Sequence, residues 1–147
     1  MATASKNGSP KILILATLSG GYRGADSAGQ AHLEYPPNTY ILPVMSAAMF
    51  PASFYMDSFE RGIDGIIVMY SGTDSPYKGA PERTAELVNE AYELMKARNL
   101  NLQRLRLAAI CTVCARPFIE EITKMEQLLD KLGPLPHPLP VAAVPAS

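Results

Sequence analysis

The sequence predicts a three-layer α/β domain built around a four-stranded parallel sheet. Two observations lead to this fold class. Short apolar runs without polar alternation, which are typical of strands buried on both faces, recur along the chain. Longer segments with apolar residues at helical spacing lie between these runs. Strands that alternate with helices in this way favour parallel pairing through right-handed crossovers.

The first half of the chain supplies two of the predicted strands. Residues 11–17 ("KILILAT") read as a strand buried on both faces, and residues 23–34 read as a helix. The helix is expected to stop at "YPPN" (35–38), because the residue before a proline disfavours helical geometry. Residues 39–45 ("TYILPVM") form the second strand, and Pro43, which cannot donate to a ladder, indicates an edge position.

The middle of the chain continues the alternation. Residues 51–62 are predicted to be a helix that ends at Gly62, and residues 65–71 ("GIIVMYS") a third buried strand. The longest helix is expected from Pro81 to Asn99, since proline is favoured at the first helical position.

The last strand and helix complete a flavodoxin-like or Rossmann-like arrangement. Residues 105–111 ("LRLAAIC") are predicted to be the fourth strand, and residues 116–132 the last helix, closed by Gly133 and Pro134. We therefore divide the chain into a flexible N-terminus (1–10), a single α/β domain (11–133) and a proline-rich extended tail (134–147).

The composition disfavours several classes of partner. The chain has 147 residues, a formal net charge of −1 and a sequence pI of about 6.1, so the sequence predicts no nucleic-acid partner. No apolar run approaches the roughly 20 residues that a membrane span needs. Residues 1–10 lack the pattern of a signal peptide, so a cytoplasmic location is expected.

In parallel α/β domains ligands meet the loops at the carboxyl ends of the strands. Four loops are predicted at that edge of the sheet: 16–24, 46–51, 71–80 and 111–116. Any binding or catalytic site is expected among them.

The first and third of these loops allow a phosphate-binding interpretation. The candidate residues are Thr17, Ser19, Gly20, Gly21, Ser71 and Thr73. Backbone amides of a glycine-rich loop that leads into a helix can hold the phosphate of a flavin or nucleotide. Glycine-rich turns also exist simply to let a helix and a strand pack closely. The loop has neither the P-loop lysine nor a complete GxGxxG, because "GGYRGA" has the wrong spacing.

The third loop, "SGTDSPYKGA" (71–80), has other polar residues with two interpretations. Asp74, Tyr77 and Lys78 offer a carboxylate, a phenol and an amine that could bind a ligand. They are equally the residues of an ordinary solvated turn.

The two cysteines, Cys111 and Cys114, follow the fourth predicted strand as "CTVC". In a reducing compartment a CxxC pair suggests a metal site or redox chemistry, although a closed metal site needs four ligands. Thiol–disulfide chemistry is a further possibility, because the pair precedes a helix N-terminus. Two small buried apolar residues explain the pair as well. His32 is expected on a helix surface, which gives little support to a cysteine–histidine or serine–histidine enzyme.

Three segments carry a resemblance to a known family: "YRGADSAGQAHLEYPPN" (22–38), "ILPVMSAAMFPASFYMDSFERGIDGIIVMYSG" (41–72) and "NLNLQRLRLAAI" (99–110). They are similar, in order and almost without gaps, to the iron–sulfur delta subunit of methyl-viologen-reducing hydrogenase. The resemblance covers roughly residues 11–132, and "GAD-x-AG", "YPPN", "F-x-x-G-x-DG" and "LRL" make it specific. Members of that family also occur fused to, or beside, heterodisulfide-reductase-type flavoproteins.

The resemblance implies a cofactor that this chain has lost the means to hold. Family members bind a two-iron cluster through cysteines in the loops after the first three strands. Carried over position by position, these cysteines fall on Ala16, Thr17, Gly20, Ser46, Ser71 and Pro76. No thiolate remains at these positions, and thiolate is the ligand that such clusters use. The family usually has no cysteine where Cys111 and Cys114 stand, which leaves open a relocated metal site completed by a partner chain.

The function expected from the resemblance is that of a non-catalytic accessory subunit of a multi-subunit redox complex. No cofactor is expected in the chain itself, and its partners are expected to carry FAD and iron–sulfur clusters, foremost a flavin-containing heterodisulfide-reductase-like subunit. Contact candidates are "MFPASFYM" (49–56) and the proline-rich tail, although a core face explains the first segment equally well. Two alternatives remain: a flavodoxin-like flavin or nucleotide binder using loops 16–24 and 71–78, and an electron-transfer subunit with a metal site at Cys111 and Cys114.

Overall fold

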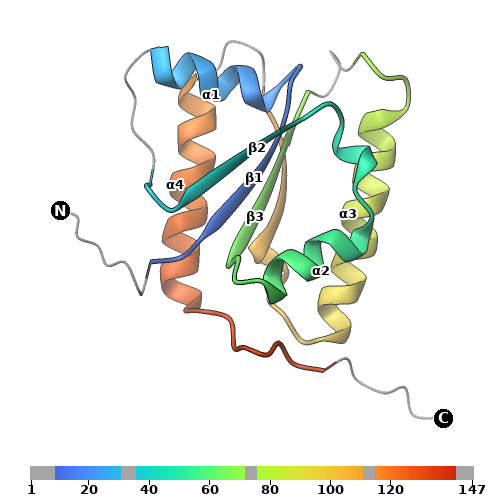
Figure 1. Ribbon diagram of the computed structural model, residues 1–147, viewed down its shortest axis with the longest axis vertical. Coiled ribbons are helices and arrows are strands. Elements are labelled where there is room, and N and C mark those ends of the chain that lie inside the picture. The colour runs from blue at the N-terminus through green and yellow to red at the C-terminus, as the bar shows by residue number, and fades with distance from the viewer. Residues whose placement is uncertain (1–8, 31–35, 72–75, 111–114, 142–147) are drawn as a thin grey trace.

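The computed structural model describes residues 9–30, 36–71, 76–110 and 115–141, and it contains the predicted parallel α/β domain (Figure 1). The strands are β1 (Ile12–Thr17), β2 (Thr39–Val44), β3 (Gly65–Tyr70) and β4 (Leu105–Ala109). The helices are α1 (Gly21–Gln30), α2 (Ala52–Glu60), α3 (Ala80–Ala97) and α4 (Ala115–Leu132), with short 3-10 turns η2 (Ala47–Met49) and η3 (Leu102–Arg104).

The strands pair in the order β2-β1-β3-β4, and all neighbours are parallel. This order confirms the edge position that Pro43 predicts for β2. The Leu18 amide donates to the Val44 carbonyl (2.9 Å), so the backbone groups of Val44 face β1. Because these groups alternate along a parallel strand, the nitrogen of Pro43 points away from β1, where its missing hydrogen costs no ladder bond.

Each central strand supplies apolar side chains to two separate cores. Ile66 and Val68 of β3 belong to the cluster that packs under α2 and α3. Ile67 and Met69 belong to the cluster on the opposite face, with residues of α4 such as Phe118. All four of these β3 side chains are fully buried, which explains why the strand shows no polar alternation in the sequence.

The helix bounds that the structure describes lie within two residues of the predicted ones. α2 ends at Glu60 and α3 at Ala97, each two residues before its predicted end. α1 begins at Gly21, two residues earlier than predicted, and its predicted end falls within 31–35, outside the described residues. Gly62 after α2 and Gly133 after α4 both have a positive φ (110° and 79°), as expected for glycines that terminate helices.

The proline-rich segment after α4 packs on its own domain. Leu135 and Leu139 are buried in the cluster under α2 and α3. The Nε of Arg98 donates to the Pro140 carbonyl (2.7 Å), and the same guanidinium forms an ion pair with Glu60 of α2 (2.8 Å). This part of the tail therefore contributes side chains to the core, and Figure 1 shows it running beneath the end of the domain.

A buried arginine joins the amino end of the sheet to the start of this tail. The Arg104 guanidinium donates to the carbonyls of Asp64 (3.1 Å) and Gly133 (2.7 Å). The Asp64 carboxylate accepts from the backbone amide of Lys11 (3.0 Å). Burial lowers the pKa of Arg104, and the charge of Asp64 opposes this shift.

No helix within the described ranges is long and apolar enough to cross a membrane.

We expect the substitution Arg104→Met to lower the free energy of unfolding by about 1–3 kcal/mol, because two buried carbonyls lose their donor. The melting temperature should fall by about 2–4 °C for each kcal/mol lost. The matched control is Arg83→Met, since Arg83 pairs only with exposed glutamates among the described residues and such pairs contribute little. Equal melting temperatures for the two variants would show that the Arg104 hydrogen bonds are not stabilising.

Candidate functional site

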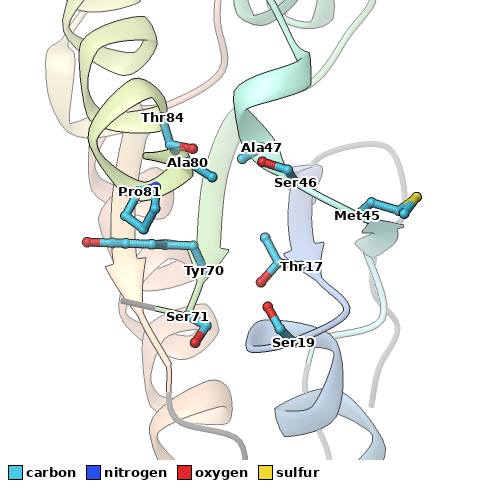
Figure 2. Close-up of a pocket in the computed structure, with 10 residues that line it drawn as sticks. All are labelled: Thr17, Ser19, Met45, Ser46, Ala47, Tyr70, Ser71, Ala80, Pro81 and Thr84. Carbon is cyan, nitrogen blue, oxygen red and sulfur yellow. The ribbon is translucent and has the colours of Figure 1, made fainter. Parts of the chain in front are cut away.

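The carboxyl ends of three adjacent strands meet at one small pocket (Figure 2). Thr17 ends β1, Ser46 follows β2 and Ser71 follows β3, and all three side chains line it. Ala80 and Pro81, from the first turn of α3, close the opposite wall. The pocket therefore brings together one family cysteine position from each of the three loops that the resemblance identifies.

The other three cysteine positions have different surroundings. Ala16 is fully buried within β1. Gly20 lies in the turn after β1, against the backbone of Ser71. Pro76 is exposed and lines a neighbouring groove.

The pocket does not fit a two-iron cluster. Its cavity volume is about 10 Å³, roughly the space that one water molecule requires. A cluster with two irons, bridging sulfides and four cysteine sulfurs is much larger. The side-chain donors of Thr17, Ser46 and Ser71 are hydroxyls, whereas iron–sulfur clusters are held by thiolates.

The hydroxyls in the pocket differ in what they bind. Ser46 Oγ accepts from the amide of Ala48 (3.2 Å) and thereby caps the short turn η2. Thr17 is only 5% exposed, and its Oγ1 has no hydrogen-bond partner among the described residues. Figure 2 shows the Thr17 and Ser19 hydroxyls on the same side of the pocket. Ser46 thus has a local structural role, and Thr17 keeps an unused hydroxyl.

The two glycines after β1 allow very close packing against β3. A Cβ on Gly20 would lie 2.6 Å from the Ser71 nitrogen, and one on Gly21 would lie 2.5 Å from the Met69 Cβ. Only glycine fits at such distances. The geometry therefore gives these glycines a packing role.

Two amides of this turn already have backbone partners. Leu18 donates to the carbonyl of Val44 (2.9 Å), and Gly20 donates to the carbonyl of Thr17 (3.0 Å). They are not available to a phosphate group. This leaves the phosphate-binding interpretation of loop 16–24 with fewer donors than its sequence suggests.

Several residues singled out from the sequence fall outside the described residues. These are His32, Thr73, Asp74, Cys111 and Cys114. The predictions about them therefore stay predictions. Within the described part of the chain, no group of three or more histidine, cysteine or acidic side chains is arranged to hold a metal ion.

An apolar groove beside the pocket was not predicted from the sequence. Its cavity volume is about 200 Å³, and its lining includes Leu18, Met45, Tyr77 and Arg23. Leu18 and Met45 are exposed. The available signal was that large apolar residues directly follow two predicted strands, where polar loop residues are more usual.

A larger cavity of about 450 Å³ lies at the other end of the sheet, beside the tail. Lys11, Asp64, Asp130 and His137 contribute its polar lining. The Asp64 carboxylate is occupied by the Lys11 backbone amide, and the His137 Nε2 lies 3.1 Å from the Phe59 carbonyl oxygen. The His137 contact connects the tail to the domain.

Comparison with known proteins matches most of the chain to one protein family. A family model described as "Methyl-viologen-reducing hydrogenase, delta subunit" matches residues 12–133. The vhu iron-sulfur subunit of an F420-non-reducing hydrogenase from Methanocaldococcus jannaschii is 23% identical over 128 residues, covering 86% of this chain and 96% of that protein. The iron-sulfur subunit of an F420-non-reducing hydrogenase from Archaeoglobus profundus is 26% identical over 132 residues, covering 88% and 96%.

A third relative is a much longer protein. This subunit of the ferredoxin:CoB-CoM heterodisulfide reductase of Methanosarcina mazei is 25% identical over 135 residues. The match covers 91% of this chain but only 17% of that protein. In this relative the matching segment is therefore one part of a larger polypeptide.

The packing role of Gly20 is testable by adding a single methyl group. We expect Gly20→Ala to lower the free energy of unfolding by about 1–3 kcal/mol, because the new Cβ would overlap the backbone of Ser71. Gly29→Ala is the control: it lies in α1 with no atom within 4 Å of the added carbon, and it should be neutral or stabilising by up to about 1 kcal/mol. Urea unfolding of both variants checks this, and a neutral Gly20→Ala would contradict the packing interpretation.

The unused hydroxyl of Thr17 leads to a second prediction. Thr17→Val should leave stability unchanged or raise it by about 1 kcal/mol, since it removes a buried polar atom that has no partner among the described residues. Ser58→Ala should instead destabilise by about 1 kcal/mol, because the Ser58 hydroxyl donates to the Phe54 carbonyl (2.9 Å). Calorimetry distinguishes the two, and a clearly destabilised Thr17→Val would mean that this hydroxyl has a bound partner.

Proposed function

The chain belongs to the family of the methyl-viologen-reducing hydrogenase delta subunit, and on this premise we propose that it is a non-catalytic member of a larger redox complex. The complex is of the hydrogenase or heterodisulfide-reductase type. The chain takes part in it without the two-iron cluster of the family.

This proposal rests on the donor atoms in the three loops where the resemblance places the family cysteines. Thr17, Ser46 and Ser71 present hydroxyls where the resemblance places cysteines, and their pocket has room for about one water molecule. The sequence contains two cysteines in all, Cys111 and Cys114, both after β4. A two-iron cluster needs four protein ligands, so one chain with two cysteines cannot hold it with thiolates alone.

The consequence for electron transfer is direct. An electron relay needs a redox centre, and serine, threonine and glycine side chains provide none. What the chain keeps is the scaffold: the parallel sheet, both helical layers and the close packing of the first turn on β3. This supports a role in holding other subunits in position.

The relatives support protein partners of a defined kind. Two of them are named as subunits of hydrogenases, and the third belongs to a heterodisulfide reductase and includes a matching segment within a longer chain. We infer that the partner of this chain is a heterodisulfide-reductase-like subunit that carries flavin, with iron–sulfur clusters elsewhere in the complex.

The proposal is tested by anaerobic purification of the tagged chain from its native host, followed by separation of its partners. We expect the isolated chain to be colourless, with no stoichiometric iron or flavin, while identified hydrogenase or heterodisulfide-reductase subunits that copurify contain both. Ultraviolet–visible spectra and iron and flavin assays per chain provide the measurement. The Methanocaldococcus jannaschii relative, prepared in the same way, serves as the control for cluster retention.

Two results would contradict the proposal in different ways. Iron or zinc that stays with the chain and is lost when Cys111 and Cys114 are changed to serine would establish a relocated metal site. A yellow chain that releases flavin would favour the flavodoxin-like alternative through loops 16–24 and 71–78.

A further inference from the structure

One stretch of the chain carries no charge, and several of its large side chains lie on the surface. Between Glu34 and Asp57 the sequence has no acidic, basic or histidine residue, although charged residues make up 18% of the whole chain. The described part of this stretch runs along the edge strand β2, through η2 and into α2 (Figure 1). Such a stretch is unusual for a segment that borders solvent.

Large apolar side chains of this stretch are exposed. Tyr40 is 51% exposed, Leu42 39%, Met45 56% and Met49 68%, and we call these four residues the β2 face. Tyr40 pairs in register with Leu13 and Leu42 with Leu15. Because paired residues of a sheet share a side, Tyr40 and Leu42 project on the side that α2 and α3 cover elsewhere. The helices leave this border of the sheet open.

The rest of "MFPASFYM" (49–56) divides between core and surface. Tyr55 and Met56 are buried in the core under α2, as the core interpretation of this segment predicts. Met49 alone is a large exposed apolar residue within it, and it extends the β2 face toward α2.

The opposite edge of the sheet is protected in the ordinary way. Arg106 of β4 is exposed and pairs with Glu121 of α4, with Nε and Oε2 2.6 Å apart. Charged side chains on an edge strand discourage association. The charged residues on α3 likewise form exposed pairs, such as Lys96 with Glu93 (3.0 Å). Among the described residues, the β2 edge strand has no charged side chain of this kind, and exposed apolar surface of this sort is typical of protein–protein contacts.

The β2 edge is poorly suited to pairing with an added strand. The backbone groups of Thr39, Ile41 and Pro43 point outward, because those of Val44 face β1. Pro43 has no amide hydrogen, and the Thr39 amide already donates to the Pro36 carbonyl (3.2 Å). Within β2 this leaves the Ile41 amide as the one outward donor, so docking must rely on side-chain packing.

We propose that the β2 face is the surface by which the chain docks on a larger subunit of its redox complex, against an apolar and uncharged patch. The inference rests on the proposed function and names the contact surface. Charge complementarity carries the choice of partner chemistry: none of the four residues of the β2 face is charged, and Arg23 borders the face only beside Met45. A partner charge buried on the face would find no opposite charge within it, which favours a neutral partner patch.

Two further observations favour a larger subunit of the redox complex as the partner. Met45 belongs to the β2 face and also lines the pocket between the strand ends, so the face is continuous with the edge where the family cysteine positions meet. In the heterodisulfide reductase relative, the matching segment belongs to a longer chain. A domain built into a larger protein has a permanent neighbour, and we expect this chain to use a similarly stable, apolar contact.

The test introduces one buried charge into the proposed contact. Leu42→Glu and Met49→Glu are compared with Leu94→Glu, which places the same charge on an exposed apolar position of α3 that is not part of the β2 face. Each tagged variant is expressed in the native host, and identified hydrogenase or heterodisulfide-reductase subunits that copurify are quantified by mass spectrometry. Melting temperatures of the purified chains check that every variant is folded.

We expect both β2-face variants to recover at least about tenfold less of these subunits than the unchanged chain, and Leu94→Glu to recover the same amount. Unchanged recovery with Leu42→Glu and Met49→Glu would overturn the docking surface and leave the proposed function standing. If no such subunit copurifies with the chain without substitutions, both the docking surface and the proposed function are overturned. Light scattering could instead show that the purified chain is a dimer and that both variants are monomers. The β2 face would then bind a second copy of the chain, which would overturn the choice of partner.

Discussion

The requirement that a parallel sheet be covered on both faces determines most of this structure. β1 and β3 are buried on either side, so residues that follow one another along β3, such as Ile67 and Val68, serve different cores. Helices must therefore lie on both faces, and each crossover returns the chain to the same end of the sheet. The starts of α1 and α3 and the ends of three strands meet at one edge as a result. The position of the candidate site is therefore set by the helices that cover the sheet, and it does not depend on which residues line the site.

That separation between scaffold and site means that the fold does not rest on the residues at the strand ends. The helical layers and the sheet do not depend on the donor atoms at the strand ends. The turn after β1 is held by backbone hydrogen bonds and by Gly20 packed on Ser71, and Ser46 caps its own turn. These contacts are local and need no metal. A cluster-free member of the family is physically reasonable because the remaining space is small and its walls support one another.

The sequence predicted the fold class and every strand because buried strands and glycine-terminated helices leave local patterns. Pro43 identified the edge strand correctly, since a missing amide restricts where a strand can pair. The resemblance identified Thr17, Ser46 and Ser71 as related positions, and the structure places them around one pocket. What these residues bind was not predictable from the pattern, because hydroxyl residues serve turns and ligands alike.

Other features could not be derived because they depend on contacts between distant residues. The exposure of Tyr40 and Leu42 depends on how far α2 and α3 extend over the sheet, which no single segment encodes. Arg104 looks like an ordinary surface residue in the sequence, yet its two carbonyl partners are 29 and 40 residues away. The burial of Leu135 and Leu139 is also a long-range effect within a proline-rich segment that has no helical or strand period.

The packing of that segment has a consequence for the order in which the protein forms. Leu135 and Leu139 follow the last helix, and both complete the core between the sheet, α2 and α3. During synthesis on the ribosome the strands and helices emerge first, while this core still lacks two of its side chains. The nascent domain therefore exposes apolar surface until the segment after α4 has left the exit tunnel.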